Sequence, residues 1–221
     1  GLRQVRRFEP RMEASVIIPV KDECDNVEPI CDAFARLLIE NSCVREVIFV
    51  DDHSRDSTLD RLKSSCAKFA FVRLLAENEH RGKGAAIRSG FRESRSEILV
   101  MMDGDQEYSP LDIPQLLEPI LSGDADLVVG QGMNPRNSAV RWLLSKAFRM
   151  FFVCMFGIEV SSPNEGLKAI LKQRFNELNV TATGFDFDVE LLVKAKRNQL
   201  RIVQVPVGRH GRCTGKSKVL V

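Results

Sequence analysis

Three acidic side chains alternate directly after a short apolar run, and this spacing is the first feature that could do chemistry. Residues 98–102 read ILVMM, and Asp103, Asp105 and Glu107 follow at every second position. Carboxylates held this close repel one another unless a cation lies between them. Mg²⁺ characteristically binds one or two carboxylates together with phosphate oxygens of a substrate. The cluster therefore indicates a metal that holds a diphosphate, and Gly104 leaves room for the ligand to reach the backbone.

Two more apolar runs end in polar residues of the same kind. The run at 15–20 is followed by Lys-Asp-Glu at 21–23, and the run at 46–50 by Asp-Asp-His-Ser at 51–54. In open α/β sheets, ligands bind beyond the carboxyl ends of the strands, and parallel neighbours bring those ends together. Each stretch taken alone has a simpler explanation, because acidic residues commonly cap the helix that follows. Three such ends on one sheet edge favour a binding site.

A glycine-rich stretch at 78–90, NEHRGKGAAIRSG, suggests a phosphate-binding loop, but its spacing differs from that of nucleotide triphosphatases. Their pattern, GxxxxGK[ST], requires glycine at the first position and serine or threonine after the lysine. Position 78 is asparagine and position 84 is glycine, so the stretch does not predict this class. Lys83 at the start of a helix either meets an anion or is simply solvated, and this stretch alone favours neither.

The elements that must position these residues are short apolar strands separated by amphipathic helices. Short β-branched runs are typical of a parallel sheet that is covered on both faces. Strand–helix–strand repetition of these lengths requires right-handed crossovers and a doubly wound sheet. We expect strands at 15–20, 46–50, 71–75, 97–102 and 125–130, and helices around 27–38, from 56 onward and at 83–93.

The order of the elements changes after residue 130. The sequence predicts a long helix at 139–156, a break at 161–166, a strand at 166–171, a helix around 189–197 and a last strand at 201–207. We interpret this part as an elaboration of the same domain. No internal repeat, low-complexity segment or linker separates it from the first part.

Composition bounds the class of protein. The 221 residues are 44% hydrophobic and 28% charged, which suffices for one sizeable core. A net charge of +2 is too small to attract nucleic acid to the whole molecule. The basic ends of the chain lack the interleaved aromatic residues and the recognition helix of a nucleic-acid-binding protein. The six cysteines form no CxxC pair and indicate buried thiols in a reducing compartment. No signal peptide is visible, and a membrane segment beyond either end, or on a partner, stays open.

The ordered motifs resemble glycosyltransferase family 2, whose members have the nucleotide-diphospho-sugar transferase fold called GT-A. The similarity is greatest to the branch of dolichol-phosphate mannose synthases and polyprenyl-phosphate glycosyltransferases. The resemblance implies an α/β fold with a mostly parallel central sheet and helices on both faces. It implies a single catalytic domain over 1–221. The nucleotide-binding part of this domain would span about 12–130, and the acceptor-side part about 131–221. It rests on eight stretches in family order: SVIIPVKDE, EVIFVDDHSRDST, NEHRGKGAAIRSGF, ILVMMDGDQEYSP, ADLVVG, LLSKAF, PNEGLKAI and VPVGRHGRCTGKSK.

The resemblance assigns the donor and the metal to residues of the first part. Asp103 and Asp105 match the DxD motif, which contacts the donor and Mg²⁺ or Mn²⁺, and Asp105 is expected to be catalytic. Glu107 stands where the family often has glutamine, and its carboxylate can still ligate the metal. The residues that the resemblance implies for the nucleotide sugar are Pro19, Asp22, Glu23, Asp52, Lys83, Asp103, Gly104 and, from the end of the chain, Lys218.

The acceptor is assigned to residues of the second part. Arg141 and Ser145 match an Arg-xxx-Ser pattern near the acceptor phosphate. Arg212 and Ser217-Lys218 match the R-xx-GxSK ending of the family, a loop that clamps phosphates.

Three departures from the family pattern leave donor and acceptor open. Lys21-Asp22 replaces an aromatic residue and asparagine before Glu23. Gln131-Gly132 stands where the family commonly has Ser-Arg, and Arg136 is a candidate substitute for that arginine. Ser162 stands where an aspartate usually precedes the Gly-Phe of the family.

The expected function is the inverting, metal-dependent transfer of a hexose from a GDP-mannose- or UDP-glucose-type donor to a polyprenyl or dolichyl phosphate. One alternative is a family 2 transferase that acts on a sugar hydroxyl, which would require a carboxylate base such as Asp105 or Asp186. Asp186 and Asp188 are more readily explained by a helix start, and Glu190 by a structural hydrogen bond. The other alternative is a catalytically silent protein that binds nucleotide sugars.

The apolar helix at 141–157 raises the question of a membrane. It is shorter than the ~20 residues that a spanning helix needs. A core helix is the simpler interpretation, whereas an interfacial helix would bring the enzyme to a lipid acceptor. The resemblance favours the second and places the domain at the cytoplasmic side of a membrane, peripheral or as the soluble part of a membrane protein.

Overall fold

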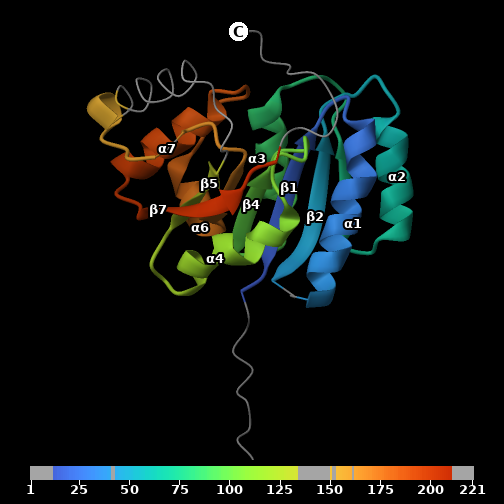
Figure 1. The fold of residues 1–221 in the computed structure, drawn as a ribbon. Coiled ribbons are helices and arrows are strands. Elements are labelled where there is room, and N and C mark those ends of the chain that lie inside the picture. Colours follow the sequence, from blue (N-terminus) through green and yellow to red (C-terminus); the bar gives the residue numbers. More distant parts are fainter. Residues whose placement is uncertain (1–11, 41–42, 134–149, 151–152, 161, 211–221) are drawn as a thin grey trace, which may run out of the picture.

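A computed structural model describes residues 12–40, 43–133, 150, 153–160 and 162–210. Within these residues the chain forms a seven-stranded sheet with helices on both faces (Figure 1). The elements in chain order are β1 (Ala14–Val20), α1 (Cys24–Glu40), β2 (Val44–Asp51), α2 (Thr58–Lys68), β3 (Val72–Ala76), α3 (Lys83–Glu93), β4 (Ile98–Met102), the short 3-10 helix η1 (Pro110–Asp112), α4 (Ile113–Leu121), β5 (Leu127–Met133), β6 (Leu167–Leu171), α6 (Lys172–Leu178), α7 (Phe187–Arg197) and β7 (Ile202–Gly208).

The sheet is mostly parallel, as the resemblance implies. Its strand order is β3-β2-β1-β4-β6-β5-β7. Only β6 runs against its neighbours, β4 and β5. Because β1 pairs in parallel with both β2 and β4, the carboxyl ends of these three strands lie at one edge. Strands from both predicted parts of the chain belong to this one sheet.

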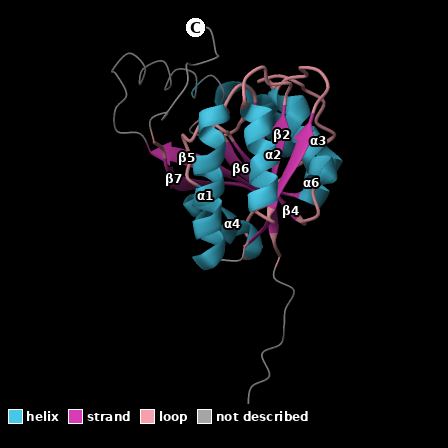
Figure 2. Cartoon of the chain, turned by 90° about the vertical axis from the view of Figure 1, so that its right-hand side faces the viewer, coloured by secondary structure: helices cyan, strands magenta, loops and turns pink. Residues whose placement is uncertain are grey.

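Two apolar cores lie on opposite faces of the sheet. Alternate residues of β1 divide between them, with Val16 and Ile18 in one core and Ile17 in the other. The first core contains residues of α1, α2 and α4, and the second contains residues of α3, α6 and α7. Figure 2 labels α1, α2 and α4 of the first group and α3 and α6 of the second. The expected coverage of both faces is therefore confirmed.

The first amphipathic helix follows its predicted face. α1 buries Val27, Ile30, Phe34 and Leu37, whose spacing of three and four residues places them on one side of a helix. Only three residues, 21–23, separate β1 from this helix, and they form the short loop that carries polar side chains.

Two helices were not predicted from the sequence. α4 has the sequence IPQLLEPIL, and its prolines suggest a loop. Pro114 lies in the first turn, where the missing N–H costs no hydrogen bond, and Pro119 lies in the last turn. The short α6 buries Phe175 and Leu178. Both helices follow from packing on the sheet rather than from local sequence.

The helix expected at 139–156 falls largely outside the described residues, although 153–156 are helical. Among the described helices, none combines the length and the apolar character needed to cross a bilayer.

Candidate functional site

A cavity of about 470 Å³ opens at the carboxyl ends of β1, β2 and β4. The structure therefore brings together most of the residues expected to bind the donor. Asp22 lies beside this cavity rather than in its wall. The wall includes Pro19, Lys21, Glu23, Asp52, His80, Lys83, Asp103, Gly104, Asp105 and Phe185.

The loop after β1 is tied to the loop after β2 through Asp22. The backbone N–H of Asp22 donates to Ser54 Oγ at 2.9 Å, and its carboxylate accepts from the N–H of Arg55 at 2.7 Å. The neighbouring Glu23 accepts a hydrogen bond from Asn26 Nδ2 at 2.5 Å and faces the cavity. Asp22 thus shapes the site, and Glu23 presents a carboxylate to it.

Asp52 fixes the loop that leads into α3. Its side chain is 6% exposed, and its oxygens accept from the N–H groups of Arg81 at 2.7 Å and Gly82 at 3.0 Å. His80 Nδ1 lies 2.6 Å from the same carboxylate. Because these bonds define the start of α3, Asp52 also sets the position of Lys83.

The two glycines around Lys83 are required by close packing. A Cβ atom on Gly82 would lie 2.6 Å from the carbonyl oxygen of Thr183, and one on Gly84 would lie 2.7 Å from that of Ala182. Gly82 also has a φ of 95°, a backbone conformation that residues with a side chain rarely adopt. The glycines therefore let α3 approach the segment before α7, and they bring Lys83 close to α7.

Asp103 is held at the end of β4 by Gly166. The N–H of Asp103 donates to the carbonyl oxygen of Gly166 at 3.0 Å. A Cβ atom on Gly166 would lie 2.3 Å from Asp103 Oδ2, which is closer than any such contact can be. The absence of a side chain at position 166 is thus what allows the present orientation of Asp103.

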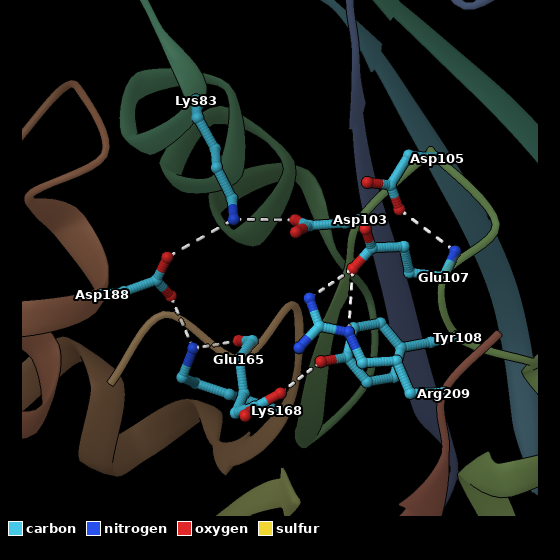
Figure 3. Close-up of polar contacts among 9 residues, drawn as sticks. All are labelled: Lys83, Asp103, Asp105, Glu107, Tyr108, Glu165, Lys168, Asp188 and Arg209. Carbon is cyan, nitrogen blue, oxygen red and sulfur yellow. Dashed lines mark hydrogen bonds and ion pairs between the residues drawn. The ribbon is translucent and has the colours of Figure 1, made fainter. Parts of the chain in front are cut away.

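A chain of alternating charges runs from the cavity into the protein (Figure 3). Lys83 Nζ lies 2.7 Å from Asp103 Oδ1 and 3.3 Å from Asp188 Oδ2. Lys168 Nζ lies 2.7 Å from Asp188 Oδ1 and donates to the carbonyl oxygen of Glu165. The exposed fraction of the side chains falls from 30% at Asp103 to 15% at Lys83, 3% at Asp188 and 0% at Lys168.

Pairing shifts the pKa values of Lys83 and Asp188 in opposite directions. Burial alone would lower the pKa of Lys83, but the carboxylates of Asp103 and Asp188 outweigh it and raise that pKa above its usual value. Burial alone would raise the pKa of Asp188, but Lys168 and Lys83 hold it below its usual value. Lys83 and Asp188 therefore both remain charged at neutral pH.

A second group of polar contacts joins the acidic loop to the end of β7 (Figure 3). Glu107 Oε2 accepts from Arg209 Nη2 at 2.6 Å and from its Nε at 3.0 Å. The N–H of His210 donates a hydrogen bond to the carbonyl oxygen of Glu107 at 2.9 Å, and the hydroxyl of Tyr108 donates a hydrogen bond to the carboxylate of Glu165. Burial, followed by the Glu165 carboxylate, raises the pKa of Tyr108, so the hydroxyl stays a donor.

The carboxylates of the acidic loop fit a divalent cation that takes its other ligands from a substrate. Asp103 and Asp105 both line the cavity, and carboxylate oxygens are the ligands that Mg²⁺ and Mn²⁺ accept. Glu107 is instead engaged by Arg209. Among the described side chains, no three His, Cys, Asp or Glu residues are grouped to hold a metal by themselves. A pair of carboxylates completed by phosphate oxygens and water is what Mg²⁺ sites commonly use.

The residues expected to bind the acceptor phosphate, Arg141, Ser145 and Arg212, lie outside the described residues, and so does Lys218, which is expected to bind the nucleotide sugar. Lys168, Asp188 and Arg209 belong to the site, and sequence reasoning missed them. One signal was available: Lys168 interrupts the apolar strand LKAIL, and a lysine at a buried position needs a counter-ion. Asp188 does lie in the first turn of α7, as expected, and Glu190 does accept structural hydrogen bonds from the N–H groups of Thr181 and Ala182.

Comparison with known proteins places the chain in a family. The chain matches the family model Glycosyl transferase family 2 over residues 15–188. This is most of the chain, and the fold is the GT-A fold of glycosyltransferases. The chain therefore belongs to glycosyl transferase family 2 and is a glycosyltransferase.

Two relatives and one solved structure illustrate the family. A dolichol-phosphate mannosyltransferase of Pyrococcus furiosus is 29% identical over 94% of this chain, and the match covers 59% of that protein. One of Mycosarcoma maydis is 30% identical over 93% of this chain and 73% of that protein. Glucosyl-3-phosphoglycerate synthase of Mycobacterium tuberculosis, crystallised with Mn²⁺, UDP and glucosyl-3-phosphoglycerate, has a TM-score of 0.70 at 25% identity over 93% of this chain and 73% of that chain. The chain thus spans less than two thirds of the first relative.

Proposed function

We propose that this chain transfers a hexose from a nucleotide-diphosphate sugar of the GDP-mannose or UDP-glucose type to a polyprenyl or dolichyl phosphate, with inversion at the sugar and with Mg²⁺ or Mn²⁺. The observation that carries the proposal is the placement of Asp103, Asp105 and Lys83 around one cavity beyond the carboxyl ends of β1, β2 and β4. Two carboxylates and a lysine at such a place suit a metal-bound diphosphate. The names of the relatives support the choice of a lipid phosphate as acceptor.

The residues of the chain have separate roles in this proposal. Asp103 and Asp105 would hold the cation, which neutralises the charge that develops on the departing nucleotide diphosphate. Lys83 would contact the same diphosphate. Pro19 and Glu23 line the part of the cavity next to β1, where we place the nucleotide with Asp52 and Gly104. Asp22 would act through the loop that it braces.

The acceptor would be positioned by Arg141, Ser145 and Arg212, and Lys218 would clamp the donor phosphates. A phosphate monoester is largely anionic at neutral pH, with a second pKa near ~6, so it needs little general base. Positioning then carries much of the rate. The pair of Glu107 and Arg209 supports the assignment of Arg212, because it ties the chain to the acidic loop only three residues earlier. Glu107 would then serve as a metal ligand only by leaving Arg209.

A lipid acceptor requires contact with a membrane surface, and we place the domain at the cytoplasmic side. Several large apolar side chains support the contact with a membrane, because they are exposed in the acceptor-side part. These are Met133, Met150, Met155 and Phe185. Phe185 also lines the donor cavity.

The test is transfer of labelled sugar from a panel of GDP-mannose, UDP-glucose and UDP-N-acetylglucosamine, with and without polyprenyl phosphate and with Mg²⁺ or Mn²⁺. We expect lipid-linked product from one donor, and its loss with excess chelator and in Asp105→Ala. Product that persists in chelator would contradict the metal role.

The same assay decides between the proposal and its alternatives. A parallel reaction contains 3-phosphoglycerate as a hydroxyl acceptor, because the solved structure named above contains glucosyl-3-phosphoglycerate. Product only in that reaction would favour a hydroxyl-directed transferase, with Asp105 or Asp186 as base. Donor binding without any product would favour a silent binding protein.

A further inference from the structure

The carboxylate of Asp103 has two possible partners in this site, the cation and Lys83. Asp103 is a proposed ligand of the cation, yet its Oδ1 already lies 2.7 Å from Lys83 Nζ (Figure 3). A divalent cation at Asp103 brings two positive charges next to the ammonium group, and like charges at this distance repel strongly. Lys83 must therefore give up Asp103 when the cation binds. Its side chain is 15% exposed, so it needs another partner nearby.

Asp188 provides that partner. Its Oδ2 lies 3.3 Å from Lys83 Nζ, on the side away from Asp103 (Figure 3). An ammonium group has three donors, and it can strengthen this contact when it leaves Asp103. Asp188 comes from α7 and Lys83 from α3, so the contact spans two elements that the glycines at 82 and 84 hold close together.

Lys168 keeps Asp188 in place. Its side chain is fully buried, and its Nζ lies 2.7 Å from Asp188 Oδ1 and donates to the carbonyl oxygen of Glu165. The two oxygens of Asp188 are thus divided, one for the buried Lys168 and one for Lys83. Asp188 cannot follow a departing Lys83, because doing so would leave Lys168 buried without its counter-ion.

We propose that Asp188 is a positioning residue that draws Lys83 away from Asp103, so that the cation and Lys83 do not compete for one carboxylate. The inference rests on the proposed function, in which Asp103 binds the cation. Lys168 and Asp188 form the fixed pair, and Lys83 is the mobile member. Held by Asp188 at the cavity wall, Lys83 remains available for the donor diphosphate.

The first test is binding of Mn²⁺ alone, measured from the loss of the free-ion signal in electron paramagnetic resonance. Lys83→Gln should tighten Mn²⁺ binding about tenfold, because it removes the competitor. Lys21→Gln is the matched control, since Lys21 carries the same charge in the wall of the same cavity. The control should change the affinity less than about threefold. Equal effects of the two variants would overturn the competition.

The second test is a double-mutant cycle on the same readout. Asp188→Asn should weaken Mn²⁺ binding about tenfold in the unaltered chain, because Lys83 then rests on Asp103 alone. In the Lys83→Gln background the same change should have less than about a threefold effect. An equal effect in both backgrounds would mean that Asp188 acts through its own charge, and the inference would be wrong.

Two further results keep the inference separate from folding and from the proposed function. Should Asp188→Asn fail to fold, Asp188→Leu combined with Lys168→Met removes both buried charges together, and the same weakening is expected. Mn²⁺ affinity unchanged in that folded variant would overturn the inference. No Mn²⁺ binding by the unaltered chain, either alone or with a nucleoside diphosphate present, would overturn the metal role itself. Binding that Lys83→Gln leaves unchanged overturns only the inference.

Discussion

At the scale of the residue, the geometry of the acidic loop depends on what surrounds Asp103. Gly166 lies against one of its oxygens and Lys83 against the other. The motif DGD identifies the expected ligands. The orientation of the Asp103 side chain, however, depends on Gly166, which is more than sixty residues later in the sequence, and on Lys83, which is twenty residues earlier. The same residue types at the same spacing would bind a cation less well if Asp103 pointed elsewhere.

Gly166→Ala tests this dependence. The new Cβ would overlap Asp103 Oδ2, so the carboxylate must leave its present position. We expect turnover to fall about 100-fold, the usual effect of a displacement of about 1 Å at a reacting site. Gly208→Ala is the control, because a Cβ there would have its nearest neighbour at an ordinary 3.5 Å, and it should retain activity. Equal activity of the two variants in a steady-state assay would contradict the role of Gly166.

At the scale of the element, α7 docks on the sheet partly through buried charge. Asp188 in its first turn meets Lys168 of β6, whereas Asp186 is exposed and accepts from the N–H of Gly184 at 3.1 Å. Two aspartates that look alike in the sequence FDFDVELL therefore do different work. The side chain of Asp186 accepts a hydrogen bond from the preceding loop, and that of Asp188 neutralises a lysine inside the protein.

The free energy of unfolding should separate these two aspartates. Asp188→Asn leaves Lys168 buried without its counter-ion and should cost about 3 kcal/mol. Asp186→Asn should cost less than about 1 kcal/mol, because Asp186 is exposed and the amide oxygen of asparagine can accept the same hydrogen bond from Gly184. Chemical denaturation followed by circular dichroism measures both. Similar costs for the two variants would show that the buried pair contributes little.

The pH dependence of that cost has a defined sign. The pKa of Asp188 lies below its unfolded value in the folded chain, so its carboxylate stabilises the fold above about pH 4. The stability is lost as pH falls through the folded pKa. The difference in unfolding free energy between the unaltered chain and Asp188→Asn should therefore be full at pH 7 and should shrink below about pH 4. A difference that grows on acidification would contradict the ion pair.

At the scale of the whole molecule, the sequence predicts the half of the fold that carries the donor site. The buried runs before 21–23, 51–54 and 103–107 are parallel strands, and their ends meet at one edge because that is what parallel pairing requires. The second half was harder to predict. The orientation of β6 against β4 and β5 and the existence of α4 depend on packing between distant segments, which a local pattern does not contain.

The charged interior shows the same limit. Lys83 and Asp188 are 105 residues apart, and the sequence around either residue does not predict that the two form a pair. Lys168 is the one sequence signal of this interior, because a lysine in the middle of an apolar strand indicates that a buried anion lies near it. Residue types at strand ends thus predicted the cavity wall, while the ion pairs behind the wall required the structure.

The central claim is that Asp103 and Asp105 hold a cation that binds the diphosphate of a sugar donor. It is tested most directly by a crystal structure with Mn²⁺ and a nucleotide sugar, using the anomalous scattering of manganese to locate the ion. The account predicts an anomalous peak within coordination distance of carboxylate oxygens of Asp103 and Asp105 and of the donor diphosphate. A bound donor whose diphosphate lies away from both aspartates, or a manganese peak elsewhere in the molecule, would contradict it.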